Sequence, residues 1–403
     1  MKRLVIYCPG YDIRPVKQTF GLINREFSAF LKLRRITGAL SDLEDRPACQ
    51  LASAKWEVQV EWPSGPVTAR FLQLGWRDVI KPDFQRSWPR MAVDAIRSFW
   101  LYARADGYRA VLKSNWAHGL FCLYPAVGLV LWILVAFVPP LLFAIPAFRL
   151  ANSLLPDETS GLFAGAIVVG ASCLWIAAFQ RFMSWLEPRI YLRYLINSWH
   201  FMARLAHQKH GPMQSKIEEF AEKIVALEAQ ADADEEIVFV SHSCGTFVAI
   251  YILAAILQRR PGFGQRRGGF AFVTLGPAFD CLGGFGNQGS FSEAMSAVAR
   301  SDVDWTDIYS PHDPICGGRT PPVARYATML SNTETRPEPR RYSARIPDRM
   351  PKELLNHLRY RFFKLHFCYF FASIRPDLFD FYELTFGPKK ARDMLEAWSR
   401  VKS

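Results

Sequence analysis

The chain has 403 residues, of which 50% are hydrophobic and 21% charged, and its formal net charge is +12. This composition is apolar for a soluble protein but too charged for a polytopic transporter, so it favours a globular body with a small membrane segment. The length predicts two or three structural units. The positive charge favours an anionic partner, either nucleic acid or the inner face of a membrane.

The N-terminus and the cysteines both favour the cytosol. The apolar stretch that follows Met1-Lys2-Arg3 is too short for the core of a signal peptide, and it predicts a first strand instead. Eight cysteines are scattered without a C-x-x-C pair or a metal-ligand spacing. Reduced thiols are their simplest account, and we expect no metal site.

Strands and helices alternate along most of the sequence. Apolar runs predict strands at residues 4–8, 56–62, 68–74, 270–275, 305–309 and 341–345, and another in the run that begins at residue 237. Helices are predicted at residues 18–35, over most of 188–230, at 247–257 and at 351–373. This alternation predicts an α/β fold with a mostly parallel sheet that is covered by helices on both faces.

Two long uncharged runs interrupt this pattern, at residues 114–148 and 159–180. Each exceeds the roughly 20 residues that a helix needs to cross a membrane. Prolines at 139, 140 and 146 should kink or end the first helix, so we expect residues 119–139 to cross and the rest to form a re-entrant or interfacial tail. The alternative is a pair of buried helices in a large soluble core.

The basic residues near these runs predict how the hairpin is oriented. They gather on the outer side of each run, whereas residues 149–158 between the runs contain one arginine and two acidic residues. The positive-inside rule then predicts cytoplasmic flanks on the inner membrane and a short external turn at 149–158. The predicted organisation is residues 1–110 and 186–403 as two parts of one α/β domain, with residues 111–185 as the inserted hairpin.

The most informative local motif surrounds Ser243. The apolar run from residue 237 ends in Ser241-His242-Ser243-Cys244-Gly245, and a helix-like apolar run follows. This order is typical of a nucleophile elbow, in which a serine stands on a strained turn between strand and helix. The neighbours two positions away must be small, and both are, although Ser241 replaces the usual glycine. The alternative is an ordinary serine-rich connection.

With these residues the chain resembles the α/β-hydrolase superfamily of serine hydrolases, in particular its membrane-tethered bacterial members. The similar parts are the first strand with Pro9-Gly10-Tyr11-Asp12, the elbow, residues 273–277, the Asp313-Pro314 loop and a late His366-Phe367-Cys368-Tyr369. Their order along the chain carries the resemblance, which spans all of the chain except the hairpin. A hairpin inserted before the nucleophile strand is unusual for the family.

The resemblance implies a triad in the chain order Ser, Asp, His. Only His357 and His366 follow both the serine and a plausible acid. We favour His366 because its neighbours at helical spacing are aromatic, which predicts a water-poor site. His357 remains the alternative base, and a core histidine bonded to a carbonyl is the structural alternative for His366.

The predicted acid is Asp313, because it follows the strand at residues 305–309, where this architecture presents functional groups. Asp307 lies within that strand, and a turn-forming Asp-Pro is the structural alternative for Asp313. Backbone N–H groups of Cys244 and of Gly10 or Tyr11 would hold the oxyanion.

These residues predict a membrane-anchored serine hydrolase that cleaves a carboxylic ester or thioester, with an acyl ester or lipid as substrate. A catalytically inactive membrane binding or scaffold module and an acyltransferase remain alternatives. No cofactor is expected, because the glycines at 284, 286 and 289 do not directly follow a strand. Anionic lipid accounts for the basic residues better than nucleic acid does, since no aromatic strand motif accompanies them.

Overall fold

The computed structural model describes residues 1–45, 52–105, 107–114, 116–154, 157–279, 290–316, 320–323 and 338–399. Cys49, Cys281 and the glycines at 284–289 therefore lie outside the described residues. The chain divides into two compact units. The first comprises Met1–Gln85, Trp100–Cys122 and Phe201–Ser403, and the second comprises Arg86–Phe99 and Leu123–His200.

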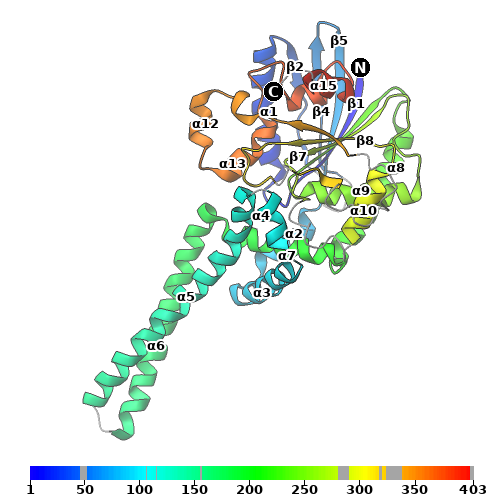
Figure 1. The fold of residues 1–403 in the computed structure, drawn as a ribbon. Coiled ribbons are helices and arrows are strands. Elements are labelled where there is room, and N and C mark those ends of the chain that lie inside the picture. Colours follow the sequence, from blue (N-terminus) through cyan, green and yellow to red (C-terminus); the bar gives the residue numbers. More distant parts are fainter. Residues whose placement is uncertain are drawn as a thin grey trace. The chain divides into compact units, whose positions relative to one another are not determined.

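A single sheet organises the first unit (Figure 1). Its strands are β1 (Lys2–Cys8), β2 (Thr37–Leu40), β3 (Glu44–Asp45), β4 (Ala52–Trp62), β5 (Gly65–Leu74), β6 (Glu236–His242), β7 (Phe270–Leu275), β8 (Asp304–Tyr309) and β9 (Arg340–Ser343). They lie in the order β2-β4-β5-β1-β6-β7-β8-β9, and β3 pairs with β4. From β5 to β9 every pairing is parallel, while β2, β3 and β5 pair antiparallel with β4. The predicted α/β fold with a mostly parallel sheet is confirmed.

Helices cover both faces of the sheet. Val5, Tyr7 and Val238 point into a core cluster that includes side chains of α1 (Val16–Arg34), α14 (Phe381–Phe386) and α15 (Ala391–Ser399). Successive side chains of a strand alternate between faces, so Leu4 and Ile237 point to the opposite face. There α9 (Gly245–Arg259) contacts β1 and β6, and α8 (Gly211–Gln230) and α10 (Ser290–Ala299) pack against α9.

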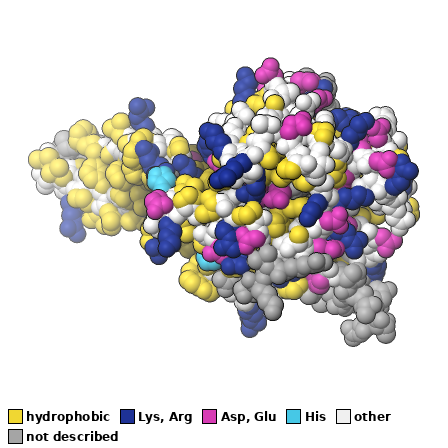
Figure 2. Space-filling model, turned by 90° about the horizontal axis from the view of Figure 1, so that it is seen from above, with side chains coloured by type: hydrophobic (Ala, Val, Ile, Leu, Met, Phe, Trp, Pro, Cys, Tyr) yellow, Lys and Arg dark blue, Asp and Glu magenta, His cyan; other side chains and the backbone are white. Residues whose placement is uncertain are grey.

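The two uncharged runs form the long helices α5 (Trp116–Leu154) and α6 (Asp157–Ile190), which are long and apolar enough to cross a membrane. Large apolar side chains on both are exposed, among them Leu141, Leu142, Leu162 and Leu174. Figure 2 shows hydrophobic side chains covering most of this hairpin's visible surface.

Of the two effects expected from these prolines, a kink or an end of the helix, the end is wrong, because α5 continues through Pro139, Pro140 and Pro146. A proline lacks the N–H that would bond the carbonyl four residues earlier. The carbonyl that Pro139 leaves unbonded belongs to Val135, and Trp175 of α6 donates its Nε1–H to it at 3.0 Å. The bounds of the turn predicted at 149–158 are wrong, because residues 149–154 belong to α5 and residues 157–158 belong to α6.

The predicted helix at residues 351–373 is also wrong. It is divided into α12 (Lys352–Leu358), α13 (Phe362–His366) and the 3-10 turn η4 (Phe367–Phe370). Leu365, His366, Cys368, Tyr369 and Phe370 are all buried. Successive residues of an α-helix turn by about 100°, so a surface helix would expose some of these five. The segment formed by α13 and η4 therefore lies largely inside the unit and not on its surface.

The remaining helical elements of the described chain were not predicted individually, except that one falls in the mainly helical stretch at 188–230. They are α2 (Arg77–Gln85), α3 (Trp88–Arg104), α4 (Gly107–Ser114), α7 (Leu192–Ala206) and the 3-10 turn η3 (Ile346–Asp348).

Candidate active site

Ser243 stands on the turn between β6 and α9 with a left-handed backbone, φ +56°. For a residue other than glycine this conformation costs on the order of 1–3 kcal/mol, and such strain gathers at functional sites. Its N–H donates to the carbonyl of Leu275 at 3.0 Å, and its carbonyl accepts from the hydroxyl of Thr246 at 2.6 Å. The side chain is 9% exposed. Ser243 therefore occupies a strained turn between a strand and a helix, which is the local arrangement that the motif predicts.

Asp313 and His366 meet in the interior, although 53 residues separate them. His366 Nδ1 lies 2.6 Å from Asp313 Oδ2, and both side chains are almost fully buried. The second carboxylate oxygen accepts the N–H of Ile315 at 3.0 Å, which fixes the carboxylate plane. With Nδ1 donating to a carboxylate, the neutral ring has its free lone pair on Nε2. That nitrogen is buried and has no hydrogen-bond partner within the described structure.

Two contacts bring His366 into the region of the elbow. The ring of His242, the residue before Ser243, lies 4.6 Å from the His366 ring between centroids, and its Nε2 donates to the His366 carbonyl at 3.0 Å. A β carbon at Gly276 would lie 3.1 Å from His366 Cε1, while the carbonyl of the preceding Leu275 bonds Ser243. Among the described residues no hydrogen bond joins His366 to the Ser243 hydroxyl.

His242 is a buried base whose protonation should limit stability in acid. Burial lowers its pKa well below the ordinary value of 6.5, and nearby His366 lowers it further. The unfolded chain takes up a proton near pH 6.5 and the folded chain does not. The neutral His242 therefore makes its full contribution to the free energy of unfolding above that pH. As the pH falls below it, this contribution is lost by up to about 1.4 kcal/mol per pH unit.

We expect His242→Gln to be less pH-sensitive than the wild type, because the amide can donate to the His366 carbonyl but cannot titrate. The variant loses packing and should melt lower at pH 7.5. The difference between the two melting temperatures should then narrow as the pH is lowered from 7 to 5. Thermal unfolding of both proteins across this pH range measures the difference. If the two plots of melting temperature against pH are parallel, the depressed pKa of His242 is contradicted.

The loop after β1 closes over the serine. A β carbon at Gly10 would lie 3.1 Å from Ser243 Cβ and 3.5 Å from its Oγ. Cys244 begins α9, with its backbone N–H at the positive end of that helix. Tyr11 is buried, and its hydroxyl donates to Asp83 at 2.6 Å, which anchors the loop. The three residues predicted to hold an oxyanion thus lie on the two segments that flank the serine.

The alternative base His357 lies on α12 and is exposed. The described contacts of Asp313 include His366 and not His357. His357 and His366 belong to separate helices, α12 and α13. No group of three or more potential metal ligands occurs in the part of the chain that the structure describes.

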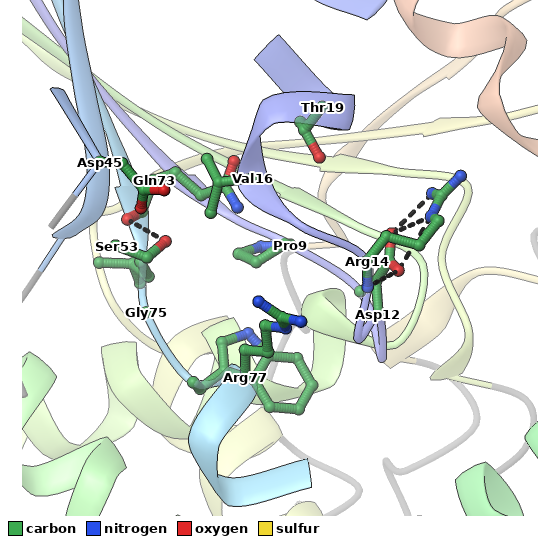
Figure 3. A pocket seen from close by; sticks show the side chains of 13 residues that line it. Pro9, Asp12, Arg14, Val16, Thr19, Asp45, Ser53, Gln73, Gly75 and Arg77 are labelled. Atoms are coloured by element: carbon green, nitrogen blue, oxygen red, sulfur yellow. Dashed lines mark hydrogen bonds and ion pairs between the residues drawn. The ribbon is translucent and has the colours of Figure 1, made fainter. Parts of the chain in front are cut away.

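A hollow of about 170 Å³ opens beside Gly10, at the carboxyl ends of β1 and β5 (Figure 3). Its lining includes the charged residues Asp12, Arg14, Asp45 and Arg77 beside apolar ones such as Leu74 and Trp76. Asp12 and Arg14 form a two-pronged ion pair at 2.6–2.9 Å, visible as dashed lines in Figure 3.

Sequence reasoning did not single out His118, which contacts the Asp313 loop. This histidine lies in the first turn of α5, is 1% exposed, and approaches the carbonyl of Pro314 to 2.9 Å through Nδ1. A lone histidine in an apolar run is usually a core residue, so the sequence offered no signal for this role. Tyr369 was quoted only as part of a motif. Burial, followed by the nearby Cys316 and Asp313, raises its pKa well above 10.0, so it stays neutral beside the acid.

No family model, curated protein or solved structure matches this chain. The functional conclusion therefore depends on the site itself.

Proposed function

We propose that this protein is a membrane-anchored serine hydrolase of the α/β-hydrolase type that cleaves a carboxylic ester or thioester. The observation that carries the proposal is the buried hydrogen bond between His366 and Asp313, beside a serine on a strained strand-to-helix turn. The nucleophile follows β6, the acid follows β8 and the base follows β9, which is the chain order of that superfamily.

The chemistry follows from the positions of the hydrogen atoms. Asp313 accepts the Nδ1 proton of His366, so Nε2 is free to take the proton of Ser243 as its oxygen attacks the acyl carbon. The imidazolium then gives this proton to the leaving alcohol or thiol, and water, activated by the same nitrogen, hydrolyses the acyl-enzyme. Backbone N–H groups of Cys244 and of the Gly10–Tyr11 loop stabilise the oxyanion.

The membrane setting narrows the substrate. Two apolar helices would hold the reaction at a membrane surface, which favours a lipid ester. The hollow beside Gly10, which has charged side chains in its wall, is the proposed site for the alcohol half of such an ester. Both flanks of the hairpin are proposed to face the cytoplasm, because they carry the excess of basic residues.

A catalytically inactive module is the second candidate, because no hydrogen bond joins His366 to the serine hydroxyl in the described structure. A long contact before substrate binds is compatible with an enzyme, since such contacts often shorten in the complex.

A fluorophosphonate probe separates the two candidates. We expect wild-type protein in detergent to be labelled at Ser243, and Ser243→Ala to lose the label. Ser241→Ala is the matched control, because it removes a buried hydroxyl from the same strand and should keep the label. Well-folded wild-type protein that takes no label would favour the inactive module.

A further inference from the structure

The first turns of α5 touch both catalytic elements. His118 contacts the carbonyl of Pro314, the residue after the proposed acid, at 2.9 Å. Three residues further along α5, the ring of Phe121 packs against Phe363 of α13, the helix that ends in His366, with centroids 6.1 Å apart. All of these residues belong to the same compact unit.

The hydrogen-bond chemistry at His118 has one consistent arrangement. A carbonyl oxygen only accepts, so Nδ1 of His118 must be the protonated nitrogen that donates to Pro314. Nε2 is then an acceptor, and the thiol of Cys122, one turn along α5, lies 3.6 Å from it. His118 and Cys122 are each 1% exposed, so the bond to Pro314 forms away from water.

Hydrogen bonds to backbone groups hold the loop that carries Asp313, at residues 310–316. Residues 310–316 form turns. The N–H of Asp313 donates to the backbone carbonyl of Ser310, and the N–H of Cys316 donates to the backbone carbonyl of Asp313. The peptide unit between Pro314 and Ile315 carries both the Pro314 carbonyl, which His118 holds, and the Ile315 N–H, which donates to the carboxylate of Asp313. Fixing that carbonyl therefore fixes the direction in which the carboxylate presents its other oxygen to His366.

We propose that His118 is a positioning residue that holds the Asp313 loop in register with His366, and that it thereby links the triad to the apolar hairpin. This inference rests on the proposed function, because it assigns His118 a part in that same reaction. α5 runs without interruption from this contact to Leu154, so the helix that would enter the membrane also begins at the acid loop. Loss of the His118 N–H donor should therefore lower kcat and leave KM nearly unchanged.

The test compares two side chains of nearly equal shape. His118→Asn can still donate a hydrogen bond near the position of Nδ1, whereas His118→Leu cannot. We expect His118→Leu to lower kcat for a water-soluble short-chain nitrophenyl ester by about 10- to 100-fold with little change in KM, since a displacement of about 1 Å can cost 100-fold. His118→Asn should recover most of that loss.

A matched control removes a comparable bond elsewhere. His200 Nδ1 lies 2.9 Å from the hydroxyl of Ser98 in the other unit, and His200→Leu should leave kcat within about threefold of wild type. All kcat values are taken per serine that reacts with the fluorophosphonate probe, so partial unfolding does not imitate the effect. If His118→Leu does not fold, His118→Phe makes the same comparison with His118→Asn.

The outcomes distinguish the two proposals. Wild-type turnover that depends on Ser243, together with an unchanged kcat in His118→Leu, would overturn the positioning role alone. Equal losses in the leucine and asparagine variants would also overturn it, because packing and not the donor would then explain them. A wild-type protein without any Ser243-dependent turnover would remove the proposed function and this inference together.

Discussion

Replacing Asp313 with asparagine is expected to lower kcat by about 10⁴-fold and to change KM little. The reason lies in the two hydrogen bonds of the carboxylate. One oxygen accepts the N–H of Ile315 at 3.0 Å, so the asparagine carbonyl must stay there. The amide N–H₂ then faces His366 Nδ1, where a carboxylate oxygen stood at 2.6 Å.

Two donors cannot face each other, so the imidazole should move its proton to Nε2 in this variant. A protonated Nε2 cannot accept the serine proton, although the ring keeps its place. Steady-state kinetics on a soluble ester measure the loss. The fluorophosphonate labelling rate should fall in parallel, because phosphonylation also needs the base.

Asp307→Asn is the matched control for this prediction. Asp307 is as fully buried as Asp313 and lies on the strand that leads to it, where Oδ1 accepts the hydroxyl of Thr274 at 2.6 Å. This control should keep kcat within a few fold of wild type. If Asp313→Asn keeps more than a tenth of the wild-type kcat, Asp313 does not orient the base.

The parts of the site that follow local rules could be predicted from sequence. The elbow at Ser243 depends on a strand, a tight turn and a small residue at Gly245, all within ten residues. The order of strands also helped, because the carboxyl ends of parallel β6 and β8 lie at one edge of the sheet. That edge is where Ser243 and Asp313 follow their strands.

The parts that depend on distant partners could not be predicted. Pro139 signals the end of a helix, and nothing in the sequence reveals that Trp175 bonds the carbonyl that the proline leaves free. The break between α12 and α13 contains neither glycine nor proline, so the sequence carries no local signal for it. His118 reaches Pro314 across 196 positions of the chain. Tertiary contacts decide each of these cases over local preference.

The edge of the sheet was predicted only in part. The strands β4 and β5 were expected, but their antiparallel pairing and the strands β2 and β3 were not. Residues of β2 and β3 are mostly exposed, so they lack the apolar pattern by which a strand is recognised. This edge takes part in the proposed site, because Asp45 of β3 and Ser53 of β4 line the hollow beside Gly10.

Gly245→Ala is expected to destabilise the protein by about 3 kcal/mol or more and to abolish turnover. A β carbon at Gly245 would lie 2.6 Å from the carbonyl oxygen of Cys8 and closer still to that of Pro9. These are backbone atoms at the end of β1, a central strand whose Cys8 is in register with Ser241 of β6. Neither segment can move aside without breaking the ladder.

Gly21→Ala provides the matched control, because a β carbon there meets nothing within 4 Å. Gly21 lies inside α1, where alanine should stabilise the helix by about 0.5–1 kcal/mol. Thermal unfolding in detergent should therefore show a fall of more than about 5 °C for Gly245→Ala and a small rise for Gly21→Ala. A Gly245→Ala protein that melts with the wild type would mean that strand and helix do not meet there. The strained turn under Ser243, on which the nucleophile assignment depends, would then be absent.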